Sequence, residues 1–353
     1  MKQELLDKIH ETNQIRLIIP IAIVILCLFL AVLSLSVSQT HITISESFRI
    51  FIDGLKNTEI DDYETYLKRK IVYETNGPRA IGALLAGATL AVGGAVLQNI
   101  IRNPLADPYT LGISSGALFG MVISLTMGIS ILPFLVNDDA QIVNAFVFAL
   151  IPTAIIVFVS VFKKVSPTMM ILCGIAVMYI FTAMTTMIKY TMDPDTYAQV
   201  YTWAIGSVGG LSWKSLPKMA AGLLVALVPV SIWSRKIDII AQGDNQAITL
   251  GINPNLMRIL CLIVISLGTA TIVCYTGTIG FVGLVAPHIA RRFVGSGCRY
   301  LIPCSAAIGA VMVLGSDMAL RILEPGLPTG VMIAMICSPV FIYILARMKR
   351  NVW

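Results

Sequence analysis

Residues 77–98 read GPRAIGALLAGATLAVGGAVLQ, and Arg79 is the only charged side chain among them. A helix rises about 1.5 Å per residue, so this segment is long enough to cross the apolar core of a bilayer, which is about 30 Å thick. Small residues recur four apart in it, as at Gly82 and Ala86. Such spacing lets helix backbones pack closely where lipid provides no hydrophobic drive between helices. The segment therefore predicts a membrane-spanning helix inside a helical bundle, and lining a central path is a further role open to it.

Nine other segments are similarly long and apolar. The ten predicted spans cover residues 16–38, 78–97, 111–132, 141–162, 168–190, 215–234, 256–275, 279–296, 301–322 and 328–346. A polar stretch precedes the first span and no small-residue cleavage site follows it, so we expect it to stay as a transmembrane helix rather than leave as a signal peptide. The predicted fold is an all-α polytopic membrane protein with about ten transmembrane helices.

The composition excludes most other classes of protein. Hydrophobic residues make up 57% of the 353 residues, charged residues only 12%, and the mean hydropathy is +0.84. A water-soluble domain needs more charge to cover its surface, and the apolar stretches are too continuous for the alternating strands of a β-barrel. The seven cysteines show no Cys-x-x-Cys spacing. We interpret them as buried apolar residues and predict no metal site and no disulfide framework.

Loop charges predict that both termini lie in the cytoplasm. With the N-terminus inside, the outer connections hold Asp138–Asp139 and Asp193–Asp195, whereas the inner ones are basic. The inner basic residues are Lys2, Lys8, Arg16, Arg102, Lys163, Lys164, Arg235, Lys236, Arg258, Arg291, Arg292, Arg299, Arg347, Lys349 and Arg350. This distribution follows the positive-inside rule. Residues 39–77 then form a long outer loop of mixed charge, within a single transmembrane domain that covers residues 1–353.

A proline-rich turn follows the second predicted span. Residues 102–116 read RNPLADPYTLGISSG. The two prolines, with an asparagine and an aspartate between them, predict a rigid turn just inside the membrane. The next span then opens with small polar residues, Ser114, Ser115 and Gly116. Interrupted helices of this kind lie against protein or water rather than against lipid.

The connection over residues 237–256 predicts two short helices on the cytoplasmic face. Gly243 breaks the chain, Asp244 is positioned to cap a short helix, and Gly251 ends that helix. Asn253 then caps the next span, with a proline at its first position. We expect the short helices to expose Ile237, Ile240, Ile248 and Leu250. An apolar surface at the water boundary favours docking on a partner, and the alternative is an interfacial helix that rests on lipid.

Few ionisable residues lie within the predicted spans. Asp317 and Arg321 are four apart and can pair across one helical turn. Arg79 lies at the outer mouth of the second span, and His288 follows Pro287 in the eighth. For His288 a structural hydrogen bond is favoured over a role as a ligand or proton relay. The sequence contains no catalytic motif and no phosphate-binding G-x-x-x-x-G-K-[ST] loop, so any ATP that drives this protein must bind another chain.

Several long motifs resemble the permease subunits of type II ABC importers, which take up iron–siderophores, haem and vitamin B12. The motifs are residues 102–116, residues 277–295 (GTIGFVGLVAPHIARRFVG), residues 243–251, Trp203–Gly206, Asp317 with Arg321, and residues 327–330. The resemblance covers about residues 76–347. It implies two copies of the chain around a central pathway, two ATP-binding cassette ATPase subunits on the cytoplasmic face and a substrate-binding protein on the outer face.

The resemblance also implies roles for single residues. Residues 237–255 would be coupling helices that take up ATPase motion, through Ile240, Gly243, Asp244, Gln246, Ala247, Leu250 and Gly251. Arg79 and Arg321 match positions that pair with carboxylates of the binding protein. Asn76 replaces a second arginine of this site, so Arg69, beside Lys68 and Lys70, is expected to contribute instead. The pathway and its packing would involve Gly87, Gly94, Ser114, Ser115, Gly116, Pro287 and His288. Gly326 and Cys337 depart from the usual Glu and Gly of the family.

Alternating access driven by ATP hydrolysis on partner subunits is therefore the expected mechanism, in the cytoplasmic membrane of a prokaryote. Ferric siderophore is the first expected substrate, with haem, a cobamide or molybdate as the others. No cofactor is expected on this chain, and membrane lipid but no nucleic acid is expected as a partner. An ion-coupled secondary transporter, the main alternative, would need coupling residues in broken helices. A membrane enzyme would need a catalytic set of residues, which the sequence lacks.

Overall fold

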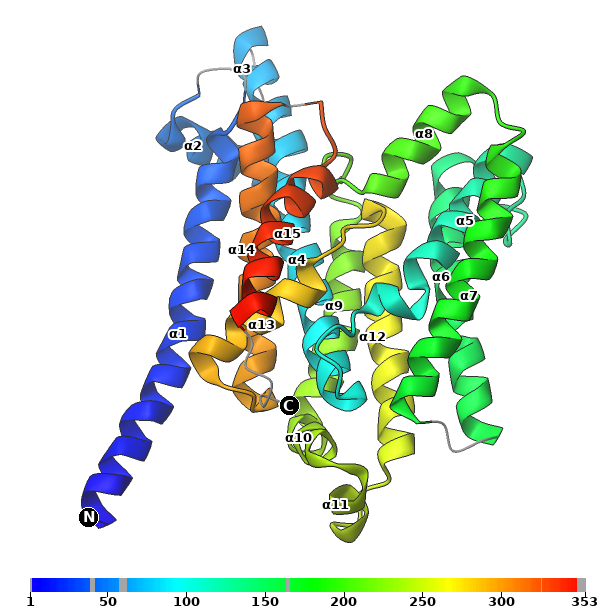
Figure 1. Cartoon of the computed structure of the whole chain (residues 1–353). Helices are drawn as coiled ribbons and strands as arrows, with labels where there is room; N and C mark the ends of the chain where they lie inside the picture. The colour runs from blue at the N-terminus through cyan, green and yellow to red at the C-terminus, as the bar shows by residue number, and fades with distance from the viewer. Residues whose placement is uncertain (1, 39–41, 57–61, 163–165, 325, 348–353) are drawn as a thin grey trace.

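Every regular element in the described part of the chain is a helix (Figure 1). The computed structural model describes residues 2–38, 42–56, 62–162, 166–324 and 326–347. The elements are α1 (Lys2–Ser36), α2 (Ile44–Leu55), α3 (Tyr63–Arg69), π-helical η1 (Lys70–Asn76), α4 (Gly77–Ile101), 3₁₀-helical η2 (Pro108–Leu111), α5 (Ile113–Met127), α6 (Asn137–Phe162), α7 (Pro167–Lys189), α8 (Pro194–Ile205), α9 (Leu216–Ile232), α10 (Ser234–Gln242), α11 (Asp244–Thr249), α12 (Pro254–Thr276), α13 (Val282–Val294), α14 (Cys298–Leu323) and α15 (Thr329–Arg347).

Each of the ten predicted spans corresponds to one helix. These helices are α1, α4, α5, α6, α7, α9, α12, α13, α14 and α15. Among the described residues, six helices are long and apolar enough to cross a membrane, and α9 with α10 makes a seventh candidate that is bent by 65°. The helices α5 and α13 have only 15 and 13 residues. The all-α multi-pass fold is thus confirmed, and the count of ten spans stays a prediction.

Besides η2, which was predicted only as a turn, four helical elements were not predicted. The outer loop contains α2, α3 and η1, and α8 follows α7. Side-chain caps explain where three of them begin, because Thr43, Asp62 and Asp193 accept hydrogen bonds from the first backbone N–H groups of α2, α3 and α8. All four lie at the end of the molecule opposite α10 and α11 (Figure 1).

The helix α4 is the centre of the bundle. Twenty of its 25 residues are buried. A Cβ atom at Gly87 would lie 2.1 Å from the carbonyl oxygen of Gly309, and one at Gly94 would lie 1.8 Å from that of Gly283. The backbone of α4 therefore touches the backbones of α14 and α13 directly, which no residue with a side chain would allow. The small residues of the opening segment thus pack helices closely, as the sequence predicted.

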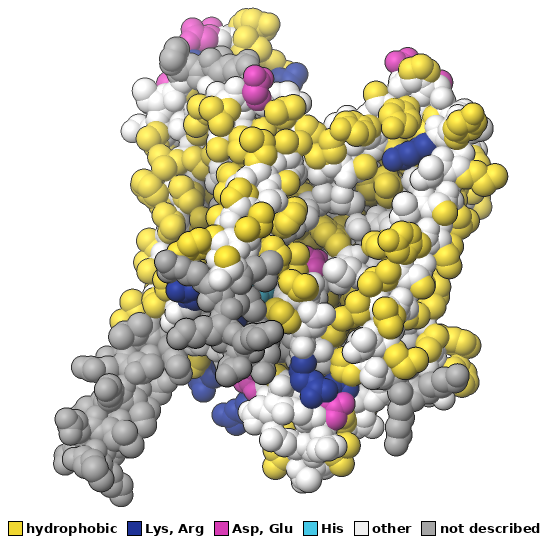
Figure 2. Space-filling view, viewed as in Figure 1, with side chains coloured by type: hydrophobic (Ala, Val, Ile, Leu, Met, Phe, Trp, Pro, Cys, Tyr) yellow, Lys and Arg dark blue, Asp and Glu magenta, His cyan; other side chains and the backbone are white. Residues whose placement is uncertain are grey.

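The direction of the first and last helices bears on the orientation of the chain. The first residues of α1 lie at the same end of the molecule as α10 and α11, and α15 runs toward that end (Figure 1). Basic side chains gather around this end, as Figure 2 shows. Both observations agree with the predicted orientation of the chain. That the chain has this orientation in a membrane stays a prediction. Of the basic residues used for it, Lys163, Lys164, Lys349 and Arg350 lie outside the described residues, as do the side chains of Lys2, Lys8, Arg16 and Arg347.

Candidate functional site

The predicted coupling helices are two short helices joined at a glycine. Gly243 separates α10 from α11 and has a φ of +141°, which L-residues rarely adopt. Gly251 ends the second helix with a φ of +74°. Asn253 caps α12 by accepting a hydrogen bond from the Leu256 N–H at 3.1 Å, and Pro254 is the first residue of that helix. The breaks and the Asn253 cap are therefore as predicted.

Asp244 has a different position from the predicted one. It is the first residue of α11 rather than its cap, and its carboxylate accepts hydrogen bonds from Arg258 Nη1 at 2.9 Å and Nη2 at 2.6 Å. Arg102 approaches the same carboxylate to 3.3 Å. The hydrogen bonds from Arg258, aided by the charge of Arg102, hold the pKa of Asp244 below its ordinary value despite partial burial. We name Arg102, Asp244 and Arg258 the inner cluster.

Only part of the predicted apolar surface faces outward. Ile237 and Ile240 are fully buried, because α10 packs these side chains onto α4 and its neighbours. Ala247 is also fully buried, so direct contact of Ile240 or Ala247 with an ATPase subunit does not fit this arrangement. Ile248 and Leu250 are 61% and 64% exposed. The side chain of Gln246 is exposed beside them.

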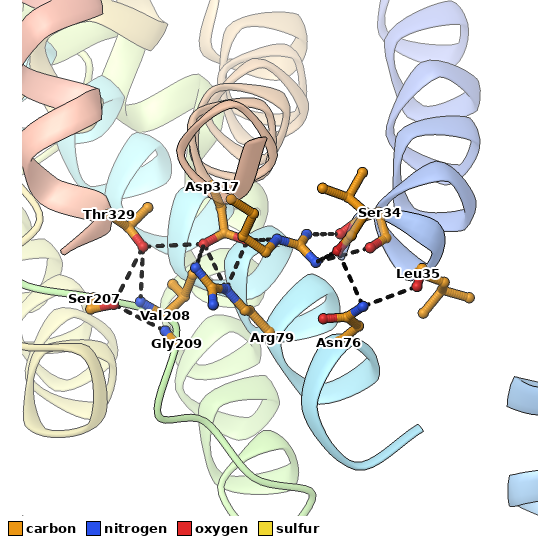
Figure 3. Close-up of polar contacts among 11 residues, drawn as sticks. Ser34, Leu35, Asn76, Arg79, Ser207, Val208, Gly209, Asp317 and Thr329 are labelled. Atoms are coloured by element: carbon orange, nitrogen blue, oxygen red, sulfur yellow. Dashed lines mark hydrogen bonds and ion pairs between the residues drawn. The ribbon is translucent and has the colours of Figure 1, made fainter. Parts of the chain in front are cut away.

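A second ionic cluster lies at the opposite end of α4 (Figure 3). Arg79, in the first turn of α4, donates from Nε to both carboxylate oxygens of Asp317, at 2.8 and 3.0 Å. The Nε of Arg321 lies 3.1 Å from Asp317, which confirms the predicted pair across one turn of α14. Thr329, at the start of α15, donates to the same carboxylate at 3.2 Å. We name these four residues the outer cluster.

Arg321 also joins the outer cluster to α1. Its Nη1 donates to the backbone carbonyls of Ser34 and Val37, at 3.0 and 3.1 Å, and its Nη2 bonds to the Ser34 hydroxyl. Asn76 donates from Nδ2 to the carbonyl of Leu35 at 3.0 Å (Figure 3). The outer ends of α1, α4, α14 and α15 are therefore held by one network of hydrogen bonds.

The predicted docking role of Arg79 and Arg321 does not follow from this network, and it stays a prediction. The side chains are only 12% and 6% exposed, and their charges face Asp317 rather than the surface. Asn76, predicted to replace a docking arginine, is likewise buried and bonded to α1. The polar groups satisfy one another inside the chain because a buried charge is costly unless it is paired.

Arg69 is more accessible than the buried arginines. It is half-buried at the end of α3, with its guanidinium 5.8 Å from the centre of the Tyr73 ring. Its neighbour Lys68 forms ion pairs with Glu46 and Glu64, both at 2.8 Å, and these carboxylates raise the pKa of Lys68. Docking of a binding protein at Arg69 stays a prediction.

The predicted pathway residues are mainly packing residues in this structure. A Cβ atom at Gly116 would lie 2.3 Å from the carbonyl oxygen of Phe148, so α5 and α6 are in backbone contact there. Ser115 donates to the carbonyl of Gly112 at 2.9 Å, and Ser114 is half-buried beside it. Pro287 is buried within α13. Whether any of them lines a pathway stays a prediction.

The Nδ1 of His288 lies 2.7 Å from the carbonyl oxygen of Leu284, one turn earlier in α13. The ring is 7% exposed and packs edge-on against Phe341. Because a carbonyl only accepts, Nδ1 donates this hydrogen bond. The arrangement agrees with the structural role favoured for His288.

The two longest motifs lie in contact with each other. The Tyr109 hydroxyl accepts a hydrogen bond from the Ile279 N–H at 3.2 Å, and a Cβ atom at Gly283 would lie 3.0 Å from the Asp107 carboxylate. Asp107 is only 4% exposed and caps η2 by accepting from the Tyr109 N–H at 2.9 Å. The sequence predicted Asp107 only as part of a turn. Its contact with Gly283 could be predicted only if residues 102–116 and 277–295 were known to pack against each other.

A polar cavity lies near the inner end of α4. Its volume is about 980 Å³, and its wall comes from α4, α7, α10, α13 and the segment after α13. Arg291 and Gln98 form part of it and are joined by a hydrogen bond of 2.6 Å. Among the described residues no group of three or more His, Cys, Asp or Glu side chains could hold a metal ion. The cavity thus offers polar contacts to a solute.

The comparisons with known proteins decide the family. The FecCD transport family matches residues 25–347 of the chain. The chain belongs to this family. A candidate ABC transporter permease from Methanocaldococcus jannaschii is 36% identical over 290 residues, which are 80% of this chain and 83% of that protein. A candidate iron chelatin transport system permease from Helicobacter pylori is 31% identical over 93% of this chain and 98% of its own length.

A solved structure agrees with the family. It shows a candidate metal-chelate type ABC transporter in an inward-facing conformation, with a TM-score of 0.81 and 26% sequence identity. The match covers 94% of this chain and 99% of that one. The chain is therefore a multi-pass transport permease of the FecCD family, and its resemblance to type II ABC importer permeases is confirmed.

Proposed function

We propose that this chain is the permease subunit of an ABC importer, and that two copies form a pathway for a metal chelate across the cytoplasmic membrane of a prokaryote. The observation that carries the proposal is the surface of α11. Ile248 and Leu250 are more than half exposed on the end of the molecule where basic side chains gather. Exposed apolar side chains at an aqueous face mark a partner surface when they lie together. An ATPase subunit is the partner that FecCD membership supports.

The proposed mechanism is alternating access. ATPase subunits bind the face formed by α10 and α11, and a substrate-binding protein delivers its ligand to the opposite face. ATP binding and hydrolysis displace α11, and the two copies rock between outward-open and inward-open states. This chain supplies the pathway and takes up the motion, while the hydrolysis takes place on the partners.

Ferric siderophore is the substrate we propose. The name of the relative from H. pylori supports an iron chelate. The cavity of about 980 Å³ at the inner end of α4 is large enough for a bulky chelate, and most of the residues that line it are polar. Haem, a cobamide and molybdate are the competing substrates.

The test is uptake by purified complexes in proteoliposomes. The chain is produced with an ATPase subunit and a substrate-binding protein from the same genome, and the ligand that co-purifies with the binding protein is identified by mass spectrometry. Transport is then measured as the accumulation of radiolabelled chelate in the vesicles, with ATP supplied either inside or outside them. The expected result is uptake that requires all three proteins and ATP. Uptake by this chain alone, driven by an ion gradient, would show a secondary transporter instead.

A further inference from the structure

The inner cluster contains a buried charge, the guanidinium of Arg258. Its burial brings no obvious gain in the free energy of unfolding. The side chain of Arg258 is 2% exposed, and its three nitrogen atoms all donate hydrogen bonds. Two bind Asp244, and the Nε donates to the carbonyl of Ile100 at 2.9 Å. Buried ion pairs contribute little to stability compared with apolar residues of similar size, since desolvation offsets their attraction. A geometric role accounts for Arg258 better than a stabilising one.

The contact with Ile100 joins Arg258 to the end of α4. This helix ends at Ile101, and Arg102 turns the backbone away with a φ of +54°. The N–H groups of Arg102 and Asn103 both bind the carbonyl of Gln98. The carbonyl of Ile100 is one of the last-turn acceptors that lack a partner within the helix, and Arg258 supplies its donor. One guanidinium therefore binds both α4 and α11.

Few other contacts fasten α11. Of its side chains only that of Ala247 is buried. A Cβ atom at Gly243 would have only the Arg102 guanidinium within 4 Å, at 3.9 Å, so the joint between α10 and α11 is loosely packed. Without the bonds to Asp244, the chain could bend at Gly243 and α11 could move independently of the bundle.

The other end of α4 is the outer mouth. After Pro78 in its first turn the helix runs to Ile101 without a further proline, and the same turn carries Arg79, which binds Asp317 in the outer cluster. A displacement of α4 along or about its axis thus reaches the network that joins α1, α14 and α15. Packed helices transmit such displacements because close-packed interiors deform little.

We propose that Arg258 is a positioning residue that fastens α11 to the inner end of α4, so that an ATPase subunit bound to α11 moves α4 and with it the outer cluster. This inference rests on the function proposed above. It assigns Arg258 and Asp244 a role in linking the two faces of the importer, in addition to the exposed side chains that contact the ATPase. Arg102, which is 40% exposed and 3.3 Å from Asp244, contributes less.

The test uses the complete complex with its ATPase and binding protein, and the variants Arg258→Gln and Asp244→Asn. Arg292→Gln is the matched control, because it makes the same chemical change at an exposed site of α13, outside the proposed ATPase-binding face of α10 and α11. The substrate-independent readout is the stimulation of ATP hydrolysis by binding protein, since coupling between two sites is reciprocal. Arg258→Gln is expected to keep subunit assembly and basal hydrolysis and to lose the stimulation, and Arg292→Gln to keep all three.

Hydrogen exchange measures the fastening itself in the same complexes. Amides of residues 244–252 are expected to exchange roughly tenfold faster in Arg258→Gln, as loss of charge-assisted hydrogen bonds predicts, while those of α10 stay unchanged. The double variant is expected to be no worse than either single one, because the two residues act as one unit. If Arg258→Gln does not fold, Asp244→Asn, at a site that is 34% exposed, replaces it.

The outcomes separate this inference from the proposed function. Wild-type stimulation and wild-type exchange in both variants would overturn the role of Arg258. Loss of assembly in Arg258→Gln and Asp244→Asn alike would overturn it too, in favour of a purely structural role. A wild-type chain that recruits no ATPase subunit would instead overturn the proposed function, and hydrogen exchange on the isolated chain would still measure the fastening of α11.

Discussion

Arg79 and Asp317, which are 238 residues apart in the sequence, form a buried ion pair in which Arg79 Nε lies 2.8 and 3.0 Å from the two carboxylate oxygens. Arg321 approaches the same carboxylate at 3.1 Å and also binds carbonyls at the end of α1. One fully buried carboxylate thus faces two guanidinium groups. It determines how four helices meet at the outer mouth.

Removing this carboxylate should strongly destabilise the protein. Asp317→Asn leaves two buried arginines without a counter-charge, and the expected loss in the free energy of unfolding is about 3–5 kcal/mol. Thermal unfolding of the purified protein in detergent measures it. Asp53→Asn is the control, because its pair with Arg49 at 3.9 Å is exposed and its loss should cost less than about 1 kcal/mol. Equal unfolding temperatures for both variants would contradict the role of Asp317.

The backbone contact between α4 and α13 should tolerate no added atom at Gly94. A Cβ atom there would lie 1.8 Å from the Gly283 carbonyl oxygen, so Gly94→Ala must separate the helices, at a cost of about 1–3 kcal/mol or more. Gly315→Ala is matched to it, since nothing lies within 4 Å of a Cβ atom at that helical site. We expect Gly315→Ala to leave the unfolding temperature unchanged or to raise it. A Gly94→Ala protein as stable as Gly315→Ala would show that α4 and α13 are not in contact.

Gly243→Val should uncouple ATP hydrolysis from transport. A β-branched residue is strained at a φ of +141°, so the turn between α10 and α11 must change. We expect assembly with the ATPase subunits to persist and uptake per ATP hydrolysed to fall about tenfold, as a loss of about 1.4 kcal/mol of coupling free energy implies. Gly251→Asn is the control, because asparagine tolerates the φ of +74° at that site. Normal uptake by Gly243→Val would count against a coupling role for this turn.

The inner cluster should be insensitive to pH in the physiological range. The pKa of Asp244 is lowered in the folded protein, so its ion pair stabilises fully above the unfolded pKa, near 4, and is lost as pH falls through the folded pKa. The difference in stability between wild type and Asp244→Asn should therefore be constant from about pH 6 to 8 and decline below about pH 4. Unfolding in detergent at a series of pH values measures it. A difference that changes between pH 6 and 8 would assign the titration to another group.

Hydropathy alone predicted the ten apolar helices, because each is a long run that must avoid water. It did not predict α8, although Asp193 followed by Pro194 is a helix-start signal. Long apolar runs predict membrane spans, whereas α8 is a short helix with exposed tyrosines such as Tyr197 and Tyr201. The helices of the outer loop were missed for the same reason.

The side-chain contacts of the candidate site were less predictable. Arg258 and Arg321 are buried and Arg79 is only 12% exposed, whereas arginine is ordinarily exposed. The carboxylate partner of Arg79 is 238 residues away in the sequence, and that of Arg258 is 14 residues away, on another helix. The predicted exposure of Ile237 and Ile240 was wrong, because this apolar face of α10 packs inside the chain rather than on a partner. Apolar periodicity in a sequence shows that one face of a helix is covered. It does not show whether the same chain or a partner covers that face.

The exposed apolar face of α11 leads to the last prediction. Leu250 is 64% exposed, so Leu250→Asp should leave the isolated permease as stable as wild type. In the complex it should weaken binding of the ATPase subunit about tenfold or more, since burial of one leucine contributes about 1.5–3 kcal/mol. Binding of the purified ATPase subunit to permease in nanodiscs measures this. Leu323→Asp makes the same change at a site that is 66% exposed at the other end of the molecule, and it should bind the ATPase normally. If Leu250→Asp bound with wild-type affinity, the docking surface would have to lie elsewhere on the inner face.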